Sequence, residues 1–274
     1  MASPRFASNP RLKSAAGNGR PIVRGTNDIA VHLLQMALLD LGFKLPRSTG
    51  GVRSPHGIFG AETEAAIKEF QDDQDLDPDG RVGRETMAAF DSSFPSHTHR
   101  VRLHFRSLAL TDVPFDRLLD NAVAVYSQYG INVEFGSGES LLLTSEQQDK
   151  FARIDQTCDW NLDSGEFEEL QSLGSRAPNT DVLVYFVVTF LEDNLLGCGG
   201  HAKDRPACTL AQRCNGFDPA HEVGHVLLGP SFSPVHSDDT RNLMFKFSTP
   251  NKDIRVLTDS QITQMRKSPV CRKV

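Results

Sequence analysis

The spacing of apolar residues along the chain changes near residue 100. Before that point it is helical, most clearly over residues 27–42, where Asn27 and Asp28 can cap a helix and Gly42 can end it. The residues that would share its apolar face are Val31, Leu34, Leu38 and Leu41. We therefore predict an amphipathic helix here.

A short pattern then occurs twice. Residues 57–63 read Gly-Ile-Phe-Gly-Ala-Glu-Thr and residues 80–86 read Gly-Arg-Val-Gly-Arg-Glu-Thr. Each copy is suited to a tight glycine turn that leads into a helix with one apolar face. With the preceding helix, the repeats predict a compact three-helix domain over residues 26–95.

From residue 100 onward, strand and helix patterns alternate. Strands are predicted at 101–110, 131–135 and 181–191, and helices at 115–129, 166–173 and 257–266. This order predicts a mixed sheet with packed helices, so the fold class is α+β with a second domain at residues 96–274.

Composition and charge argue against two properties, nucleic-acid binding and a membrane span. The net charge of −6 does not favour nucleic acid, because phosphate binding needs a clustered cationic face. The apolar run at 182–191 is half of the ~20 residues that a membrane span requires, so we expect no membrane span. Residues 1–25 carry basic but no acidic side chains, and they contain no apolar run of the length found in signal peptides. We therefore expect a disordered basic tail.

The strongest chemical signal is His221-Glu222-Val223-Gly224-His225. Asp218 and Pro219 mark the start of a helix over residues 219–228, and a Gly-Pro pair closes it. Side chains four residues apart share a helix face, so both imidazoles can reach one cation, and nitrogen ligands of this kind suit zinc. Glu222 lies beside the first ligand, where it can act as general base.

A third ligand should follow this helix. His236 is the preferred residue, and Asp238 and Asp239 are alternatives, because carboxylate oxygens also bind zinc. A loop insertion before His236 would cost little free energy if it is exposed. His201 is a further candidate for substrate contact, although an ordinary surface position is favoured slightly.

Two resemblances follow from these motifs. The first domain resembles the peptidoglycan-binding domain family through Leu34-Gln35, residues 56–60, Thr63 and Phe70-Gln71. The second resembles the metzincin zinc endopeptidases, which implies that His221, His225 and His236 bind Zn²⁺, that Glu222 is the catalytic base and that Met244 is the turn methionine beneath the metal. It departs from their usual spacing, because Leu228 and Ser231 stand where a glycine and the third histidine are common.

Together the resemblances imply a zinc endopeptidase that hydrolyses peptide bonds in peptidoglycan or wall proteins. They suggest a secreted or delivered protein acting at the wall or periplasm of a target cell, an effector toxin with an immunity or delivery protein as partner. One alternative is a general matrixin-like protease with the small domain as accessory or packing module. Another alternative is a non-catalytic wall-binding protein with a structural metal.

Residues 91–100 contain no cysteine, which argues against a zymogen that is inhibited by a cysteine thiol.

Overall fold

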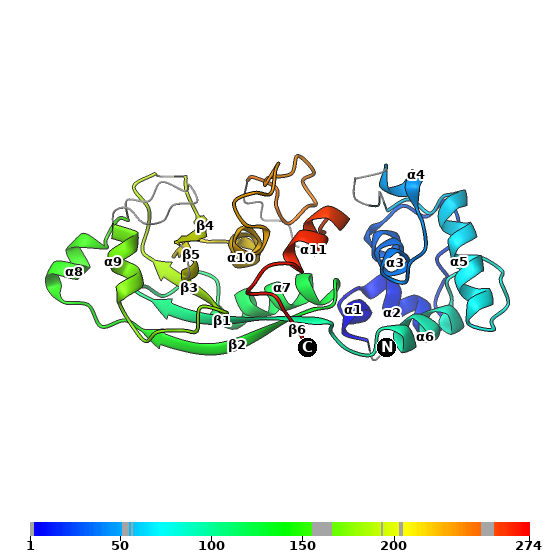
Figure 1. The fold of residues 1–274 in the computed structure, drawn as a ribbon, viewed down its shortest axis with the longest axis horizontal. Coiled ribbons are helices and arrows are strands. Elements are labelled where there is room, and N and C mark those ends of the chain that lie inside the picture. The colour runs from blue at the N-terminus through cyan, green and yellow to red at the C-terminus, as the bar shows by residue number, and fades with distance from the viewer. Residues whose placement is uncertain are drawn as a thin grey trace. The chain divides into compact units, whose positions relative to one another are not determined.

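The computed structural model describes residues 3–50, 55, 57–154, 166–192, 194–202, 205–247 and 255–274, and its fold is α+β (Figure 1). The chain divides into two compact units. The first comprises Met1–Thr98 with Ser127–Gly130 and Leu257–Thr263, and the second comprises the remainder. The predicted fold class is therefore confirmed.

The first unit contains the three predicted helices, α3 (Ile29–Asp40), α5 (Ala61–Asp73) and α6 (Arg84–Ser93), together with the short α4 (Pro46–Thr49). Asp28 caps α3 by accepting a hydrogen bond from the backbone of Val31 at 3.0 Å. Phe70 of α5 stacks on Phe90 of α6 with ring centroids 4.1 Å apart. Residues 30–38 of α3 are all buried, so this helix is covered on every side rather than amphipathic, and Leu41 of the predicted face is exposed.

Each repeat is organised by a glycine turn and a buried glutamine. Gly57 and Gly80 both have a φ of 73°, a region that favours glycine. Their backbone N–H groups donate to the side-chain oxygens of Gln35 and Gln71 at 3.0 and 2.8 Å. The repeat seen in the sequence is therefore also a repeat in structure.

The prediction of a disordered tail is wrong for residues 3–25. They form α1 (Pro4–Ala7) and α2 (Pro10–Ala16), which are capped by Ser3 and Asn9 and carry proline in the first turn. Phe6, Leu12 and Ile22 are fully buried. All charged residues of this segment are basic, but these few apolar residues and the helix caps decide the structure.

The second unit is built on one sheet with the order β2-β1-β3-β5-β4, and β6 pairs with β1. The strands are β1 (His99–Ser107), β2 (Ile131–Ser140), β3 (Val182–Val187), β4 (Gly197–Ala202), β5 (Arg205–Ala211) and β6 (Arg272–Lys273). The first four in that order run parallel, whereas β4 is antiparallel to β5 and forms an edge. The helices of this unit are α7 (Phe115–Ser127), α8 (Ser145–Lys150), α9 (Glu166–Ser172) and α10 (Asp218–Leu228), whereas α11 (Asp259–Met265) belongs mostly to the segment Leu257–Thr263 of the first unit.

The two faces of the sheet differ in polarity because β1 alternates. Phe105 packs edge-on against Phe115 of α7 at 4.7 Å, and Tyr126 of α7 donates to the carbonyl of Ala220 in α10 at 2.8 Å. Helices α7 and α10 therefore cover the same apolar face, as Figure 1 shows.

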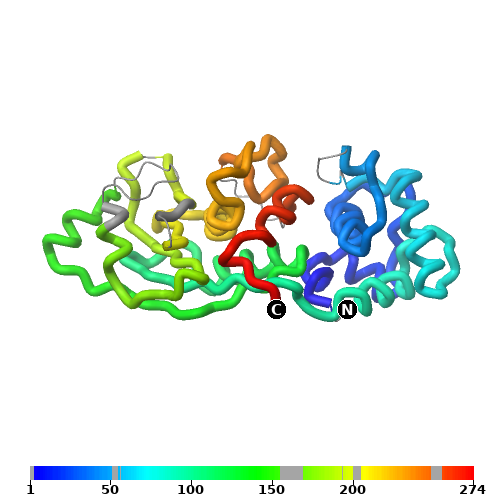
Figure 2. The backbone as a smooth tube through the Cα atoms, viewed as in Figure 1, coloured from blue at the N-terminus to red at the C-terminus, as the bar shows by residue number. Residues whose placement is uncertain are grey.

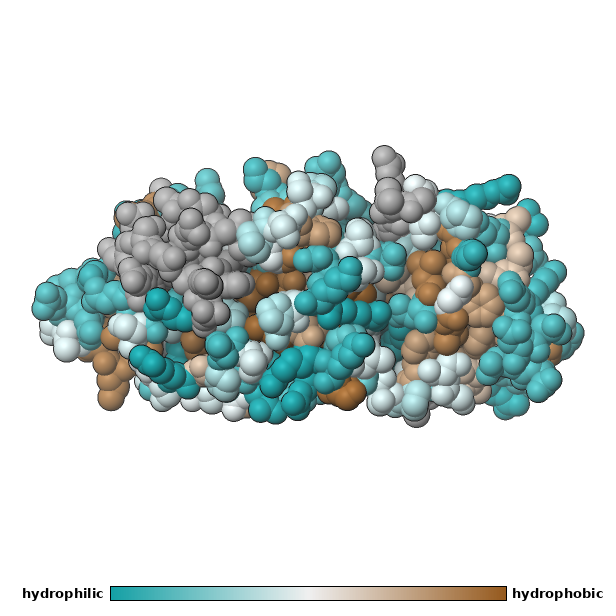
Figure 3. All heavy atoms as spheres, in the orientation of Figure 1, coloured by the Kyte–Doolittle hydropathy of each residue, from teal (hydrophilic) through white to brown (hydrophobic). Residues whose placement is uncertain are grey.

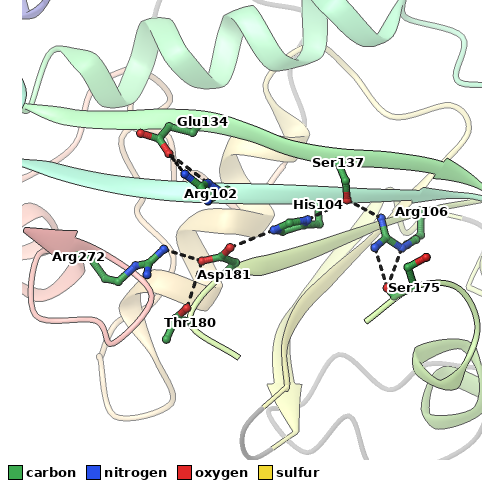
Figure 4. Close-up of polar contacts among 9 residues, drawn as sticks. All are labelled: Arg102, His104, Arg106, Glu134, Ser137, Ser175, Thr180, Asp181 and Arg272. Carbon is green, nitrogen blue, oxygen red and sulfur yellow. Dashed lines mark hydrogen bonds and ion pairs between the residues drawn. The ribbon is translucent and has the colours of Figure 1, made fainter. Parts of the chain in front are cut away.

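The opposite face holds a polar network (Figure 4). His104 lies 3.0 Å from the buried Asp181 carboxylate, which Arg272 also contacts at 2.7 Å. The other imidazole nitrogen of His104 lies 2.8 Å from the hydroxyl of Ser137, to which Arg106 donates at 3.2 Å. These contacts link β1, β2 and β6 and give the charged side chains on this face of the sheet hydrogen-bond or ion-pair partners.

Strands β4 and β5 were not predicted. The β4 sequence, Gly-Cys-Gly-Gly-His-Ala, lacks the β-branched and aromatic residues of ordinary strands, and Pro206 stands near the start of β5. On the face drawn in Figure 3, hydrophilic side chains cover most of the surface and hydrophobic ones show in limited patches. No helix in the described part of the chain is long and apolar enough to cross a membrane.

Candidate metal centre and active site

Helix α10 carries the H-E-x-x-H motif. Its bounds, Asp218–Leu228, begin one residue before the predicted start, with Pro219 in the first turn and Gly229 at the C-terminal cap. Asp218 does not cap the helix by its side chain. Instead, its carboxylate accepts a hydrogen bond from the backbone of Asn215 at 2.7 Å and so orders the preceding turn.

The imidazole rings of His221 and His225 face one another through their Nε2 atoms. The Nδ1 atom of His221 lies 2.7 Å from the Leu243 carbonyl oxygen, so this nitrogen carries the proton and donates it. The Nε2 atom is then left with a lone pair, and it lies 3.1 Å from Nε2 of His225. The carbonyl thus fixes the tautomer that a metal ligand needs.

Both imidazoles are neutral at physiological pH. Burial lowers the pKa of His221 to about 4; the hydrogen bond to the Leu243 carbonyl acts in the opposite direction, whereas His236 and Arg255 lower it further. Burial also lowers the pKa of His225 well below its usual value, and the two neighbouring histidines add to this effect. A neutral imidazole is the form that binds metal.

The loop after α10 brings His236 to the same place, although it lies eleven residues beyond His225 in the sequence. One ligand atom from each of His221, His225 and His236 lies within 4.8 Å of the others. The orange segment of Figure 2 shows this chain folding back beside the helix. Of the two alternatives, Asp239 is paired with Arg241 at 3.0 Å, and Asp238 is exposed. The structure groups His236, rather than either aspartate, with the helix histidines.

Met244 lies against helix α10 at Gly224. Its side chain is fully buried, and its backbone carbonyl accepts a hydrogen bond from Ser237 at 2.7 Å. Asn242 shapes this turn by accepting a hydrogen bond from the backbone of Met244 at 2.8 Å. A Cβ on Gly224 would come within 2.6 Å of the Met244 sulfur, so glycine at this helix position permits the close approach.

Glu222 faces the edge strand β4. Its pKa is raised well above the usual value, first by burial and then by the nearby Asp218 carboxylate, while a hydrogen bond from the Gly199 backbone opposes the rise. A Cβ on Gly197 would lie 2.5 Å from a Glu222 carboxylate oxygen. The glycines that make β4 look unlike a strand are thus required for its approach to α10.

These groups line a pocket of about 290 Å³. Its lining also includes residues 194–199, Val235, Phe245, Lys246 and Arg255. Partial burial lowers the pKa of His236, and the charge of the exposed Lys246 lowers it further. The pocket therefore combines a neutral histidine cluster and a buried carboxyl group with two cationic side chains, Lys246 and Arg255.

His201 pairs through its backbone with Pro206 in the β4–β5 ladder, and its side chain lies outside the described part of the structure. Cys198 is disulfide-bonded, whereas Cys208 and Cys214 are buried free thiols. No disulfide therefore joins any two of these three cysteines, although they lie close together in the sequence. Cys198 pairs with Thr209 and Cys208 with Gly199, so Cys198 and Cys208 point to opposite faces of the sheet.

Sequence reasoning missed several residues of this site. The Leu243 carbonyl carries no side-chain signal, and neither does the requirement for Gly197 and Gly199 beside Glu222. The clustering of glycine around Cys198 is the signal that could have found β4, because glycine in a strand often marks a close approach of another segment.

Comparison with known proteins gives two kinds of match. Residues 27–90 match the family model described as a putative peptidoglycan binding domain, which confirms the resemblance of the first domain. No curated protein sequence matches the chain.

Among solved structures, metalloproteinase-II from Bacteroides fragilis is similar at 12% identity and a TM-score of 0.44, over 62% of this chain and 53% of that one. This chain thus matches only about half the length of that structure. Archaemetzincin from Methanopyrus kandleri is similar at 12% identity and a TM-score of 0.33, over 62% of this chain and 88% of that one. Likeness at this level does not establish a shared activity.

Proposed function

We propose that this chain is a zinc-dependent endopeptidase attached to the bacterial cell wall by its first unit. The observation that carries the proposal is the convergence of His221, His225 and His236 beside Glu222 in one pocket. Zinc is the metal that three neutral imidazoles with a protonated Nδ1 on His221 fit best.

Bound there, zinc would act as a Lewis acid on a substrate carbonyl and lower the pKa of water. In this proposal the Glu222 carboxylate takes a proton from the attacking water and gives it to the leaving amine nitrogen. Burial raises the pKa of Glu222, which favours the protonated group that gives its proton to the leaving amine.

The edge strand β4 supports a peptide as the substrate. It pairs with β5 in the described sheet and leaves its other edge without a strand, while residues 197–199 line the pocket beside Glu222. An extended peptide that adds to such an edge is held by its backbone, with a carbonyl near the catalytic groups.

The peptidoglycan-binding match supports the cell wall as the location of the substrate. A wall-bound enzyme meets stem peptides, cross-bridges and wall proteins at high effective concentration. Delivery outside the producing cell, action as a toxin, and an immunity or delivery protein as partner belong to the same proposal.

The test compares the full chain with Glu222→Gln and, as a matched control, Glu146→Gln at an exposed position of α8. Purified peptidoglycan and casein are the substrates, and bound zinc is measured in each protein. We expect about one zinc per chain in all three, and a loss of turnover in Glu222→Gln of roughly a hundredfold to ten-thousandfold.

Turnover of casein but not of peptidoglycan would favour a general protease with an accessory domain. Bound zinc without turnover of either substrate would favour a non-catalytic binding protein. Normal turnover by Glu222→Gln would refute Glu222 as the base.

A further inference from the structure

The first unit contains a polar pocket of about 360 Å³ at its second repeat. Its lining includes the turn residues Asp77, Asp79 and Arg81 and the start of α6 at Arg84 and Glu85. The other wall is the chain after α2, at Asn18, Gly19 and Pro21.

The first repeat shows what the same region of the fold can bind. In it, the Glu62 carboxylate accepts two hydrogen bonds from neighbouring backbone N–H groups, those of Arg47 at 2.9 Å and Ser48 at 2.6 Å. Partial burial would raise the pKa of Glu62, but these hydrogen bonds outweigh it and the pKa is lowered. Glu62 thus binds a peptide segment, α4, through the backbone N–H groups of that segment.

Glu85 occupies the position of Glu62 in the second repeat. Each is the second residue of a helix that begins after a glycine cap, Gly60 for α5 and Gly83 for α6. In each repeat the next residue is a threonine whose hydroxyl oxygen accepts a hydrogen bond from the organising glutamine. The pairs are Gln35 with Thr63 at 2.9 Å and Gln71 with Thr86 at 3.0 Å.

The two repeats differ in what lies over this glutamate. Gln35 and its turn glycine are 22 residues apart, which leaves room for α4, whereas Gln71 and Gly80 are only 9 apart. The second repeat therefore has no counterpart of α4. Glu85 is exposed at the pocket, and no hydrogen bond or ion pair joins it to any residue that the structure describes.

We propose that this pocket is a peptide-binding site. Glu85 accepts hydrogen bonds from neighbouring backbone N–H groups of a ligand, as Glu62 does from those of α4. Arg81 and Arg84 also line the pocket and offer cations to a carboxylate of the same ligand. Asp77 and Asp79 line the pocket as well, so the ligand is a short peptide that carries both carboxylate and amino groups, the chemistry of a peptidoglycan stem. The inference rests on the proposed wall attachment and assigns it to a site.

The experiment uses the full chain with Glu222→Gln, so that the ligand is not hydrolysed. In this background, Glu85→Ala and Glu85→Gln are compared with Glu69→Ala, which removes an exposed glutamate of α5 outside the pocket. Binding is measured by titration with a stem tetrapeptide and with the wall disaccharide, and by sedimentation with insoluble peptidoglycan. Circular dichroism checks that each variant is folded.

We expect Glu85→Ala to weaken tetrapeptide binding at least about tenfold, which corresponds to ~1.4 kcal/mol. Glu85→Gln should weaken it less, because its amide oxygen still accepts a hydrogen bond, and Glu69→Ala should bind like the parent. Equal tetrapeptide binding by Glu85→Ala and the parent would overturn the inference, as would binding of the disaccharide alone.

The failure of the wider proposal looks different. If the parent chain sediments with peptidoglycan and Glu85→Ala does so equally well, the wall attachment stands and the pocket assignment is wrong. If the parent binds neither peptide nor wall, both are wrong, whatever the zinc site does in turnover assays.

Discussion

Gly224 in the middle of α10 offers a sharp test of how the metal centre is held. Replacing glycine by alanine inside a helix normally stabilises a protein by up to about 1 kcal/mol, because alanine has the higher helix propensity. Here the new Cβ would lie 2.6 Å from the Met244 sulfur and 3.3 Å from the Tyr126 hydroxyl. Both side chains are fully buried, so movement of either one displaces the neighbours packed on it.

The net effect follows from the two opposing quantities. Inserting a methyl group into a packed core costs about 1–3 kcal/mol. After subtraction of the gain in helix propensity of about 1 kcal/mol, we expect Gly224→Ala to lower the free energy of unfolding by up to about 2 kcal/mol. Movement of Met244 would also shift the Leu243 carbonyl that holds His221, so zinc affinity should fall about tenfold or more.

The assay is urea unfolding at a fixed free zinc concentration, combined with competition against a chelator for zinc affinity. The matched control is the double variant Gly224→Ala/Met244→Ala. Truncation of Met244 alone should cost about 2–5 kcal/mol, but in the double variant the added methyl group has space. The two changes should therefore couple by about 0.5–3 kcal/mol, with the double variant more stable than the sum of the single effects predicts.

Two results would refute this reasoning. One is a Gly224→Ala protein that is more stable than the parent and binds zinc equally well. The other is additivity of the two substitutions within about 0.5 kcal/mol, which would mean that the glycine and the methionine do not limit one another.

Three further outcomes are expected. Phe6→Ala should lower the free energy of unfolding by about 3–5 kcal/mol in denaturant titrations, because the ring is fully buried. A change below about 0.5 kcal/mol would instead support the prediction that this segment is disordered. Asp181→Ala should cost about 1–3 kcal/mol, since it leaves His104 and the partly exposed Arg272 without their shared carboxylate, and an unchanged urea midpoint would contradict the network of Figure 4. Because the folded-state pKa of Glu62 is lowered, its stabilising effect is complete above the unfolded pKa of about 4.3 and is lost as the pH falls through the folded value. Glu62→Gln should flatten the acid limb of stability measured against pH, and an identical limb in both proteins would count against this assignment.

The sequence by itself determined the elements whose signals are local. The helical period of residues 27–42, the two glycine turns and the capped H-E-x-x-H helix all appear in the structure within a few residues of their predicted bounds. Local signals suffice here because caps, turn glycines and apolar faces act within one or two helical turns. The residue types of the motif also limited the chemistry to nitrogen ligands and a neighbouring carboxylate.

Tertiary structure decided what depends on distant partners. Residues 3–25 are ordered because a few side chains find a core elsewhere in the first unit, and their basic composition gives no sign of it. Strand β4 forms although its residues have low strand propensity, because its glycines let it approach Glu222. His236 joins the helix histidines on a loop that is tied to the turn at Met244 through the backbone of Ser237. In each case the stabilising contact joins residues that local sequence patterns do not connect, so its energy could not be read from either segment alone.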